Sequence, residues 1–188
     1  IDIPVMVSGT ITDASGRTLS GQTVEAFWNS VRHFPLLSVG FNCALGAKQL
    51  KEYLQQLSRI ADVPISCHPN AGLPNEFGEY DASPGQMSSI IKSYLDEGLI
   101  NIIGGWCGTQ TEHIKAIAEY AQSAKPRQAP YFKPIMKLSG LEPLNVTKSL
   151  NFVNIGERTN VAGSKKFARL IRDEQFEEAV AIALEQVE

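Results

Sequence analysis

The sequence of 188 residues has no long apolar run, no cluster of basic residues and only three cysteines. Its net charge is -3, and without a basic stripe interleaved with aromatic residues we expect no nucleic acid as a partner. No apolar stretch approaches the length of a membrane-spanning helix, so we expect no membrane partner either. Three widely spaced cysteines cannot all pair within one chain, which favours reduced thiols and a cytoplasmic location.

The apolar content is sufficient for a folded core. With 43% hydrophobic residues, the chain can build one domain or one and a half. It begins at Ile1 with neither an initiator methionine nor a signal peptide, and its last apolar stripe reaches Glu188 without a Gly or Pro stop signal. We therefore expect a piece of a longer protein.

Apolar patterning in the first two thirds of the chain predicts four strand-then-helix units. Each unit pairs a short run of apolar and β-branched residues with a stripe at helical spacing; the expected strands are 3–11, 36–41, 63–67 and 100–104. Four such units in about 120 residues indicate an α/β fold that is half of a (β/α)8 TIM-type barrel, since the whole barrel needs eight strands.

Two of the expected helices have recognisable start signals. Ser83 can cap a helix in which Pro84 takes the first turn and Gln86 reaches back to the cap. Thr109 and Glu112 have the same capping-box spacing ahead of the next apolar stripe.

The composition of the sequence changes at Lys125, where prolines become frequent and periodic apolar positions become rare. We assign residues 1–124 to the half-barrel and residues 125–148 to an interdomain linker that packs along a surface. Residues 149–188 would then be the start of a second domain, with a strand at 152–155 and two helical stripes after it. These would be the first β/α elements of a second barrel.

Three of the expected strands are followed by residues that can bind metals. GFNCALG (40–46) carries Cys43, SCHPNAG (66–72) carries Cys67, His68 and Asn70, and GGWCGT (104–109) carries Cys107. Parallel strands end at one edge of their sheet, so these side chains can converge there. A catalytic zinc takes three protein ligands, accepts thiolates well and activates a bound thiol. The alternative is that each cysteine is simply a small buried hydrophobe.

Several segments of the sequence resemble one known family. SGTITDASGRTLSGQT (8–23), GFNCALG, HPNAGLPNEFGEYD (68–81) and NIIGGWCGT (101–109) are similar to the homocysteine-binding module of cobalamin-dependent methionine synthases. SGLEPLN (139–145) and FVNIGERTNVAGSKKF (152–167) resemble the linker and the opening of the pterin-binding domain in that family. The resemblance covers essentially the whole chain, in order and with ordinary spacings.

The resemblance implies roles for particular residues. Cys43 matches a zinc ligand, and a GGCCGT motif supplies the other two ligands in the family. This chain reads GGWCGT, so Cys107 matches one of them and Trp106 stands in the place of the other. Asn70 corresponds to a residue beside the metal, which occupies the fourth position when substrate is absent. Asn160 corresponds to a residue that hydrogen-bonds the pterin ring.

Trp106 is the main departure from the family pattern. Its indole has no lone pair for a metal, so we expect weak zinc binding or none. Cys67 or His68 could substitute for the missing ligand, although side chains at a strand end alternate in direction and neither residue matches a family ligand.

The resemblance implies methyl transfer from methylcobalamin to the zinc-bound thiolate of homocysteine, with 5-methyltetrahydrofolate reloading the cobalamin. The implied partners are homocysteine, methyltetrahydrofolate and the cobalamin domain of the same parent chain. We expect this chain alone to be inactive, because it holds only parts of two modules. Two alternatives stay open: a non-catalytic half-barrel fragment that pairs through its edge strands, and a cobalamin-independent zinc thiol methyltransferase.

Overall fold

The computed structural model describes residues 3–12, 15–153 and 156–187. The chain forms two compact units that divide after Asn145. Among the described residues, no helix combines the length and the apolar character that crossing a bilayer requires.

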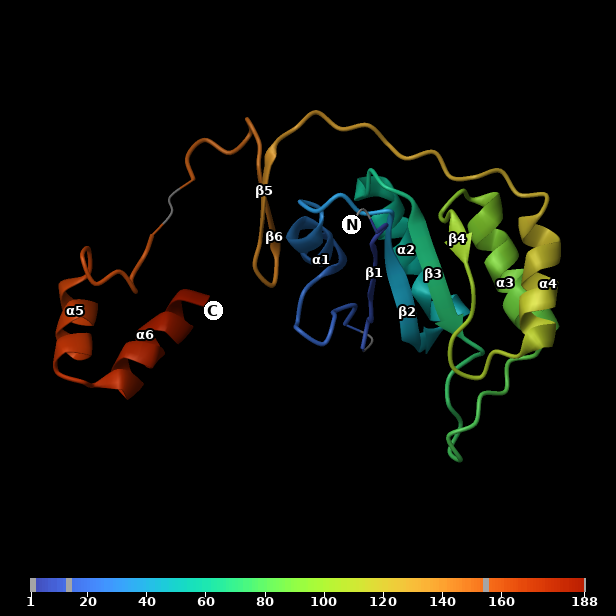
Figure 1. Cartoon of the computed structure of the whole chain (residues 1–188), viewed down its shortest axis with the longest axis horizontal. Coiled ribbons are helices and arrows are strands. Elements are labelled where there is room, and N and C mark those ends of the chain that lie inside the picture. Colours follow the sequence, from blue (N-terminus) through green and yellow to red (C-terminus); the bar gives the residue numbers. More distant parts are fainter. Residues whose placement is uncertain (1–2, 13–14, 154–155, 188) are drawn as a thin grey trace. The chain divides into compact units, whose positions relative to one another are not determined.

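The first unit is built on a parallel sheet of four strands in the order β1-β2-β3-β4, with helices alongside it (Figure 1). The alternation of strand and helix confirms the α/β class. The strands are β1 (Met6–Gly9), β2 (Ser38–Gly46), β3 (Ile65–Asn70) and β4 (Ile102–Ile103), and the helices are α1 (Val24–Val31), α2 (Ala47–Ile60), α3 (Pro84–Asp96) and α4 (Thr111–Ala121).

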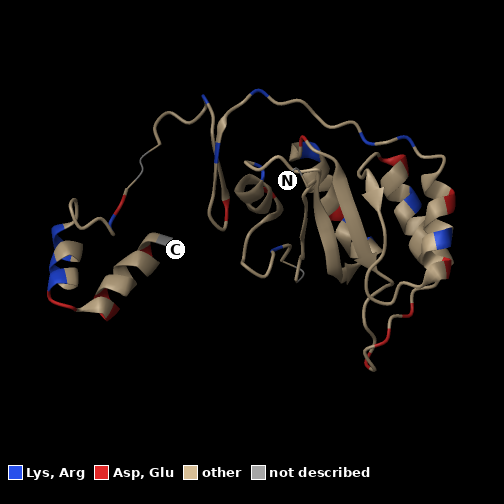
Figure 2. Ribbon diagram, viewed as in Figure 1, with Lys and Arg blue, Asp and Glu red and all other residues tan. Residues whose placement is uncertain are grey.

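The core of this unit lies between the sheet and the helices. Strand residues such as Val39, Phe41 and Ile65 are fully buried, and they join apolar side chains from α1, α2 and α3 in one cluster. The four strands of this sheet carry no Lys, Arg, Asp or Glu, so the charges of this unit lie outside the sheet (Figure 2). This segregation is what one expects of strands that are covered by helices.

The start of α3 confirms its predicted capping box. The Ser83 hydroxyl accepts a hydrogen bond from the Gln86 amide at 3.3 Å, and the Gln86 side chain accepts one from the Ser83 amide at 2.8 Å. The same prediction for Thr109 and Glu112 is wrong, since α4 has its N-cap at Gln110. The Thr109 hydroxyl instead donates to the Trp106 carbonyl, which removes it from the cap.

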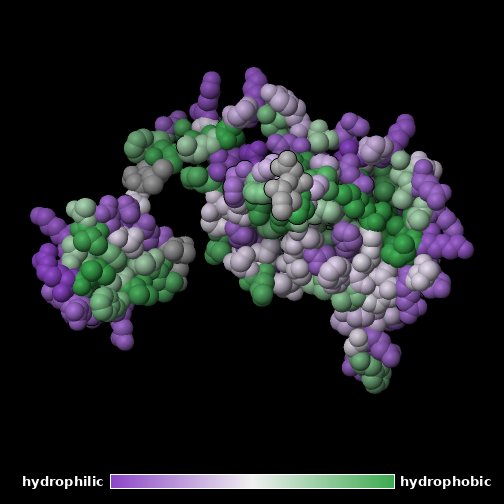
Figure 3. Space-filling model, viewed as in Figure 1, coloured by the Kyte–Doolittle hydropathy of each residue, from purple (hydrophilic) through white to green (hydrophobic). Residues whose placement is uncertain are grey.

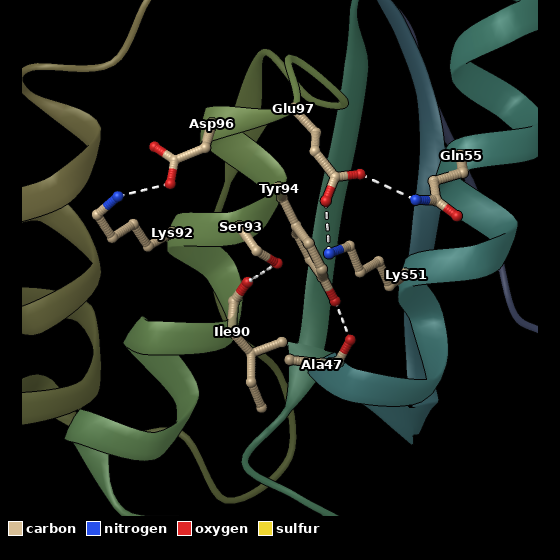
Figure 4. Close-up of polar contacts among 9 residues, drawn as sticks. All are labelled: Ala47, Lys51, Gln55, Ile90, Lys92, Ser93, Tyr94, Asp96 and Glu97. Atoms are coloured by element: carbon tan, nitrogen blue, oxygen red, sulfur yellow. Dashed lines mark hydrogen bonds and ion pairs between the residues drawn. The ribbon is translucent and has the colours of Figure 1, made fainter.

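Polar contacts join α2 to α3 across the core (Figure 4). The buried Tyr94 hydroxyl donates to the carbonyl of Ala47, the first residue of α2. At the same C-terminal end of α3, Glu97 accepts from Gln55 at 2.9 Å and forms an ion pair with Lys51 at 2.6 Å. The beginning of α2, directly after β2, is therefore fixed against a neighbouring helix.

The proline-rich segment after α4 is tied to the first unit at two places. Arg127 is 6% exposed, and its guanidinium donates to the carbonyl of Ser58 in the last turn of α2 and to those of Ala61 and Val63 just beyond it. Burial lowers the pKa of Arg127, but three carbonyl acceptors satisfy the cation. Asn101 in turn donates to the Arg127 carbonyl at 2.9 Å.

The second attachment is a two-stranded sheet that the sequence patterns did not predict. Strands β5 (Met136–Ser139) and β6 (Pro143–Val146) pair with each other, and the pair contacts α1. Asn29 donates to the Leu138 carbonyl and to Asn145, and Ser139 donates to the Ala26 carbonyl. These contacts show that the segment packs along α1.

In its described residues the second unit contains two helices, α5 (Lys165–Arg172) and α6 (Phe176–Val187), which match the two predicted stripes. Leu170, Ala179 and Ile182 form their small buried core. Apolar side chains also reach the surface of this unit (Figure 3), and they include Phe176 and Val180. The expected strand at 152–155 is absent at 152–153, while 154–155 lie outside the described residues.

Candidate thiol site at the strand ends

The carboxyl end of β3 is joined to the loop after β4 by backbone hydrogen bonds, and β2 pairs with β3 beside it. The Ala71 amide donates to the Cys107 carbonyl at 2.9 Å, and the Trp106 amide donates to the Pro69 carbonyl at 3.0 Å. These bonds fasten the end of β3 and the residue after it to the loop after β4. They place residues that were predicted to bind a metal at one edge of the sheet.

Cys43 and Cys107 lie next to each other at this edge. Their sulfur atoms are 3.8 Å apart, although 64 residues separate them in the sequence. Both thiols are partly exposed and neither is in a disulfide. Convergence of the ends of β2 and β4, expected from the parallel topology, is therefore observed for these two side chains.

The backbone around Cys43 adopts a conformation that is uncommon for residues other than glycine. Cys43 has φ 57° and Ala44 has φ 54°. The pairing of β2 with β3 shifts register here, because Asn42 is opposite His68 but Gly46 is opposite Asn70. The strand predicted to end at Phe41 thus continues through an irregularity that carries Cys43. Such left-handed residues are costly, and they cluster at functional sites.

Asn70 closes β3 and is almost completely buried, with 1% of its surface exposed. Its side-chain oxygen Oδ1 has no hydrogen-bond partner. A buried amide oxygen in this state is destabilising unless a ligand, water or ion satisfies it. The amide is therefore a candidate to bind a group at this edge.

Trp106 is 51% exposed, so about half of the side chain is open to solvent. Its carbonyl accepts hydrogen bonds from the amide and the hydroxyl of Thr109, which closes a turn just after β4. The residue that stands in the place of a third thiol is therefore held by its backbone, while its indole supplies no metal ligand.

Cys67 and His68 follow each other on β3 but have different environments. Cys67 is completely buried among core residues, and burial raises the pKa of its thiol well above the usual value. His68 is partly buried, which lowers the pKa of its imidazole, and its ring packs close to Gly104. Burial of Cys67 in the core explains why it does not join Cys43 and Cys107.

Tyr80 is a site residue that the sequence analysis missed. It belongs to the loop after β3 and is partly buried. Burial raises the pKa of Tyr80, as do its hydrogen bond to the Cys107 side chain and the nearby thiols of Cys107 and Cys43. Its position in the motif GEYD gave no chemical signal, because a tyrosine ten residues beyond a strand end is ordinarily a loop residue.

Asn160, the predicted pterin-contacting residue, lies in the second unit. Its Oδ1 accepts hydrogen bonds from the Ala162 and Gly163 amides, and its Nδ2 donates to Glu157 at 3.2 Å. The exposed side chain thus closes its own loop just before α5.

The donor set at the strand ends fits zinc only in part. Two thiolates bound to a tetrahedral zinc at about 2.3 Å would lie about 3.8 Å apart, which is the observed separation of the two sulfurs. Among the described residues, however, no group of three His, Cys, Asp or Glu side chains could hold a metal. Within the part of the chain that the structure describes, the site therefore presents two thiols and a buried amide, without a third protein ligand of the usual kind.

A comparison with known protein families covers this part of the molecule. The sequence model of the homocysteine S-methyltransferase family matches residues 1–121, which include β1 to β4, Cys43 and Cys107. The match extends over 121 of the 188 residues. Because it includes the whole parallel sheet and both site thiols, the chain belongs to the homocysteine S-methyltransferase family.

Proposed function

We propose that this chain is part of a cobalamin-dependent methionine synthase, which transfers a methyl group from methylcobalamin to the sulfur of homocysteine. In this proposal the four βα units are half of a homocysteine-binding barrel. Residues 149–188 begin the domain that binds 5-methyltetrahydrofolate, with Asn160 facing the pterin. The observation that carries the proposal is the pair of thiols, Cys43 and Cys107, 3.8 Å apart at the strand ends of a homocysteine S-methyltransferase domain.

The second unit is the reason to prefer this proposal over a cobalamin-independent methyltransferase. The family match ends at residue 121, and the chain continues into a separate compact unit that carries GERTN. A methyltransferase that uses another donor needs no folate-binding domain after its barrel. Direct binding of 5-methyltetrahydrofolate to this chain, measured by calorimetry, supports the preference, and binding that persists in Asn160→Ala contradicts the role of Asn160.

The site residues have distinct proposed roles. Cys43 and Cys107 would be two of the zinc ligands, and Asn70 would lie beside the metal. With Trp106 in the third position, we propose that zinc is held weakly or not at all and that the chain does not turn over alone. Loss of even an outer partner of a metal ligand reduces affinity about 10–100-fold, so loss of a ligand should cost at least as much.

Zinc binding by this chain and by Trp106→Cys tests the metal part of the proposal. Each protein is stripped of metal and titrated with zinc in competition with a chelator at neutral pH. We expect one tight zinc only in Trp106→Cys. Leu19→Cys is the matched control. Leu19 is 89% exposed, so this substitution adds a thiol to the chain without completing the site. Tight stoichiometric zinc in the unaltered chain would overturn the prediction for Trp106, and no zinc in Trp106→Cys would overturn the ligand assignment.

A further inference from the structure

The helix α5 collects on one side basic residues that the sequence spreads over its whole length. Four of its 8 residues are basic and exposed, namely Lys165, Lys166, Arg169 and Arg172. At about 100° per residue, Lys165, Arg169 and Arg172 lie within about 60° of one another around the helix axis. The other side carries Leu170, which is buried against α6. Lys165, Arg169 and Arg172 therefore form a basic stripe along the exposed side of α5 (Figure 2).

The basic stripe has no acidic partner in the part of the chain that the structure describes. None of the ion pairs between described residues includes a basic residue of α5, and the helix itself contains no Asp or Glu. A helix of the first unit shows the usual alternative, because Lys92 of α3 pairs with Asp96 one turn later at 2.5 Å. Mixed signs on one helix face are typical of a side that only meets solvent.

The charges of α5 repel one another and also oppose the helix dipole. Like charges three or four residues apart are destabilising, as Lys165 is to Arg169 and Arg169 is to Arg172. Lys165 and Lys166 also lie in the first turn, where the positive end of the dipole disfavours cations. The neighbouring α6 has the favourable arrangement, with two acidic residues in its first turn. A negatively charged ligand along the stripe would relieve both effects.

The shape and chemistry of the stripe fit a flexible chain of carboxylates. Lys165 and Arg172 are seven residues apart, so the stripe extends about 10 Å along the helix and can contact more than one carboxylate. Arginine binds carboxylates through two parallel hydrogen bonds. The one aromatic residue of α5, Phe167, packs on the other side, whereas surfaces for nucleic acids combine basic with stacking aromatic side chains.

The stripe begins close to the residue that is proposed to contact the pterin. The Ser164 amide donates to the Asn160 carbonyl at 2.8 Å, and the Ser164 hydroxyl caps α5 by accepting from the Phe167 amide at 3.3 Å. Lys165 follows Asn160 by five residues, which places the two at most about 18 Å apart even in an extended chain. One elongated ligand can therefore contact Asn160 at one end and the stripe at the other.

We propose that the basic stripe of α5 binds the glutamate tail of folates and prefers tails that are extended by further γ-linked glutamates. Each added γ-linked glutamate contributes another carboxylate, so a longer tail contacts more of the three cations. The inference rests on the proposed function, because it names the form of the folate substrate that the second unit would take. The stripe contributes affinity and selectivity for the tail without contacting the methyl group.

The test measures binding to the whole chain by calorimetry at about 10 mM salt, where charges are little screened. The probes are 5-methyltetrahydrofolate with a single glutamate, the same folate with five glutamates, and a penta-γ-glutamate peptide without a pterin. The variant is Lys165→Gln/Arg169→Gln, since glutamine keeps a good helix propensity. Arg59→Gln/Lys115→Gln is the matched control, because it removes one exposed arginine and one exposed lysine from helices of the first unit.

We expect the five-glutamate folate to bind about tenfold more tightly than the single-glutamate form. Each exposed ion pair contributes roughly a factor of two, and the stripe offers three cations. In Lys165→Gln/Arg169→Gln one cation remains, so the preference should fall to about twofold, while the control variant should keep it. At 1 M salt, where the screening length is about 3 Å, the preference should disappear. Circular dichroism checks that the variant retains its helices.

Separate results would overturn this inference and the proposed function. If the two folates bind equally well to the unaltered chain, the stripe does not bind the tail, while the proposed folate binding stands. If the pterin-free peptide binds through the stripe but the single-glutamate folate does not bind, the stripe keeps its role and the role of Asn160 fails. If no probe binds, both fail.

Two further results would also contradict the inference. A full preference for the five-glutamate folate in Lys165→Gln/Arg169→Gln would place the tail elsewhere on the chain. A single-stranded oligonucleotide of the same charge that binds as tightly as the penta-γ-glutamate peptide would make the stripe a general surface for polyanions, and the assignment to folate tails would be wrong.

Discussion

Cys43 and Cys107 reach the same point from loops of different construction. The loop after β2 places two non-glycine residues in the left-handed region, with φ 57° at Cys43 and 54° at Ala44. The loop after β4 has glycines at 104, 105 and 108, and the only left-handed residue described in it is Gly108. Cys43 is thus positioned by a strained backbone, whereas the backbone that positions Cys107 avoids the strain of a left-handed non-glycine residue.

The difference shows two ways of holding a reactive side chain. A left-handed non-glycine residue costs about 1–2 kcal/mol, and it persists only where the surroundings fix it. At Cys43 the surroundings are the strand pairs on either side, Asn42 with His68 and Gly46 with Asn70. At Cys107 the glycines remove the strain, and packing of Tyr80 on Gly108 takes over the positioning.

The largest expected effect comes from filling the space between Gly108 and Tyr80. Gly108→Ala adds a Cβ only 2.3 Å from the Tyr80 Cβ, at a residue with φ 76°. We expect the free energy of unfolding to fall by about 2–4 kcal/mol, from backbone strain and overpacking together. Urea denaturation measures the change.

Gly78→Ala is the matched control, because Gly78 has nearly the same φ, 78°, but no atom within 4 Å of an added Cβ. It should cost about 1–2 kcal/mol, from backbone strain alone. Equal losses in the two variants would mean that contact with Tyr80 does not hold the loop.

The third cysteine extends the comparison to a thiol inside the core. Burial raises the pKa of Cys67 above its ordinary value near 9, so the folded chain keeps this proton at a pH where the unfolded chain releases it. The free energy of unfolding should therefore be unaffected below pH 9. Above pH 9 it should fall by about 1.4 kcal/mol per pH unit. Denaturant unfolding between pH 7 and 10 measures this dependence.

Cys67→Ala should lose most of that alkaline slope. The window stops at pH 10, since the pKa of the buried Tyr94 is also raised, mainly by burial, and its phenol would add a second slope at higher pH. An unchanged slope in Cys67→Ala would assign the pH dependence to other groups.

The parts of the fold that follow from local sequence were predicted well. The stripes that became α1, α2 and α3 lie where their apolar spacing places them, and Ser83 caps α3 because a serine three residues ahead of Gln86 needs only local geometry. Thr109 and Glu112 have a similar spacing, but the Thr109 hydroxyl donates to the Trp106 carbonyl in the turn after β4 and is not available as a helix cap. The structure of this turn therefore overrode the helix-start signal in the sequence.

At the site, the nearness of Cys43 and Cys107 could be inferred because parallel topology brings strand ends together. The irregularity of β2 could not be inferred, since left-handed residues were not indicated by the sequence GFNCALG. Tyr80 was missed for a related reason. Its place at Cys107 depends on how a loop of about ten residues folds back, and on a glycine whose missing side chain makes room for it.

The smallest expected effect tests the strain at Cys43 directly. Ala44→Gly removes the Cβ that makes φ 54° costly, so the free energy of unfolding should rise by up to about 1 kcal/mol despite the greater freedom of the unfolded chain. Ala116→Gly, inside α4, is the control with the opposite sign and should lower it by about 1 kcal/mol. Urea midpoints measured side by side decide the sign of the change in stability.

A loss of stability in Ala44→Gly would mean that the left-handed backbone is not strained in this setting. A gain would show that the chain carries an unfavourable residue next to a site thiol that a single substitution could relieve, as expected where geometry at a functional site is maintained at the expense of stability.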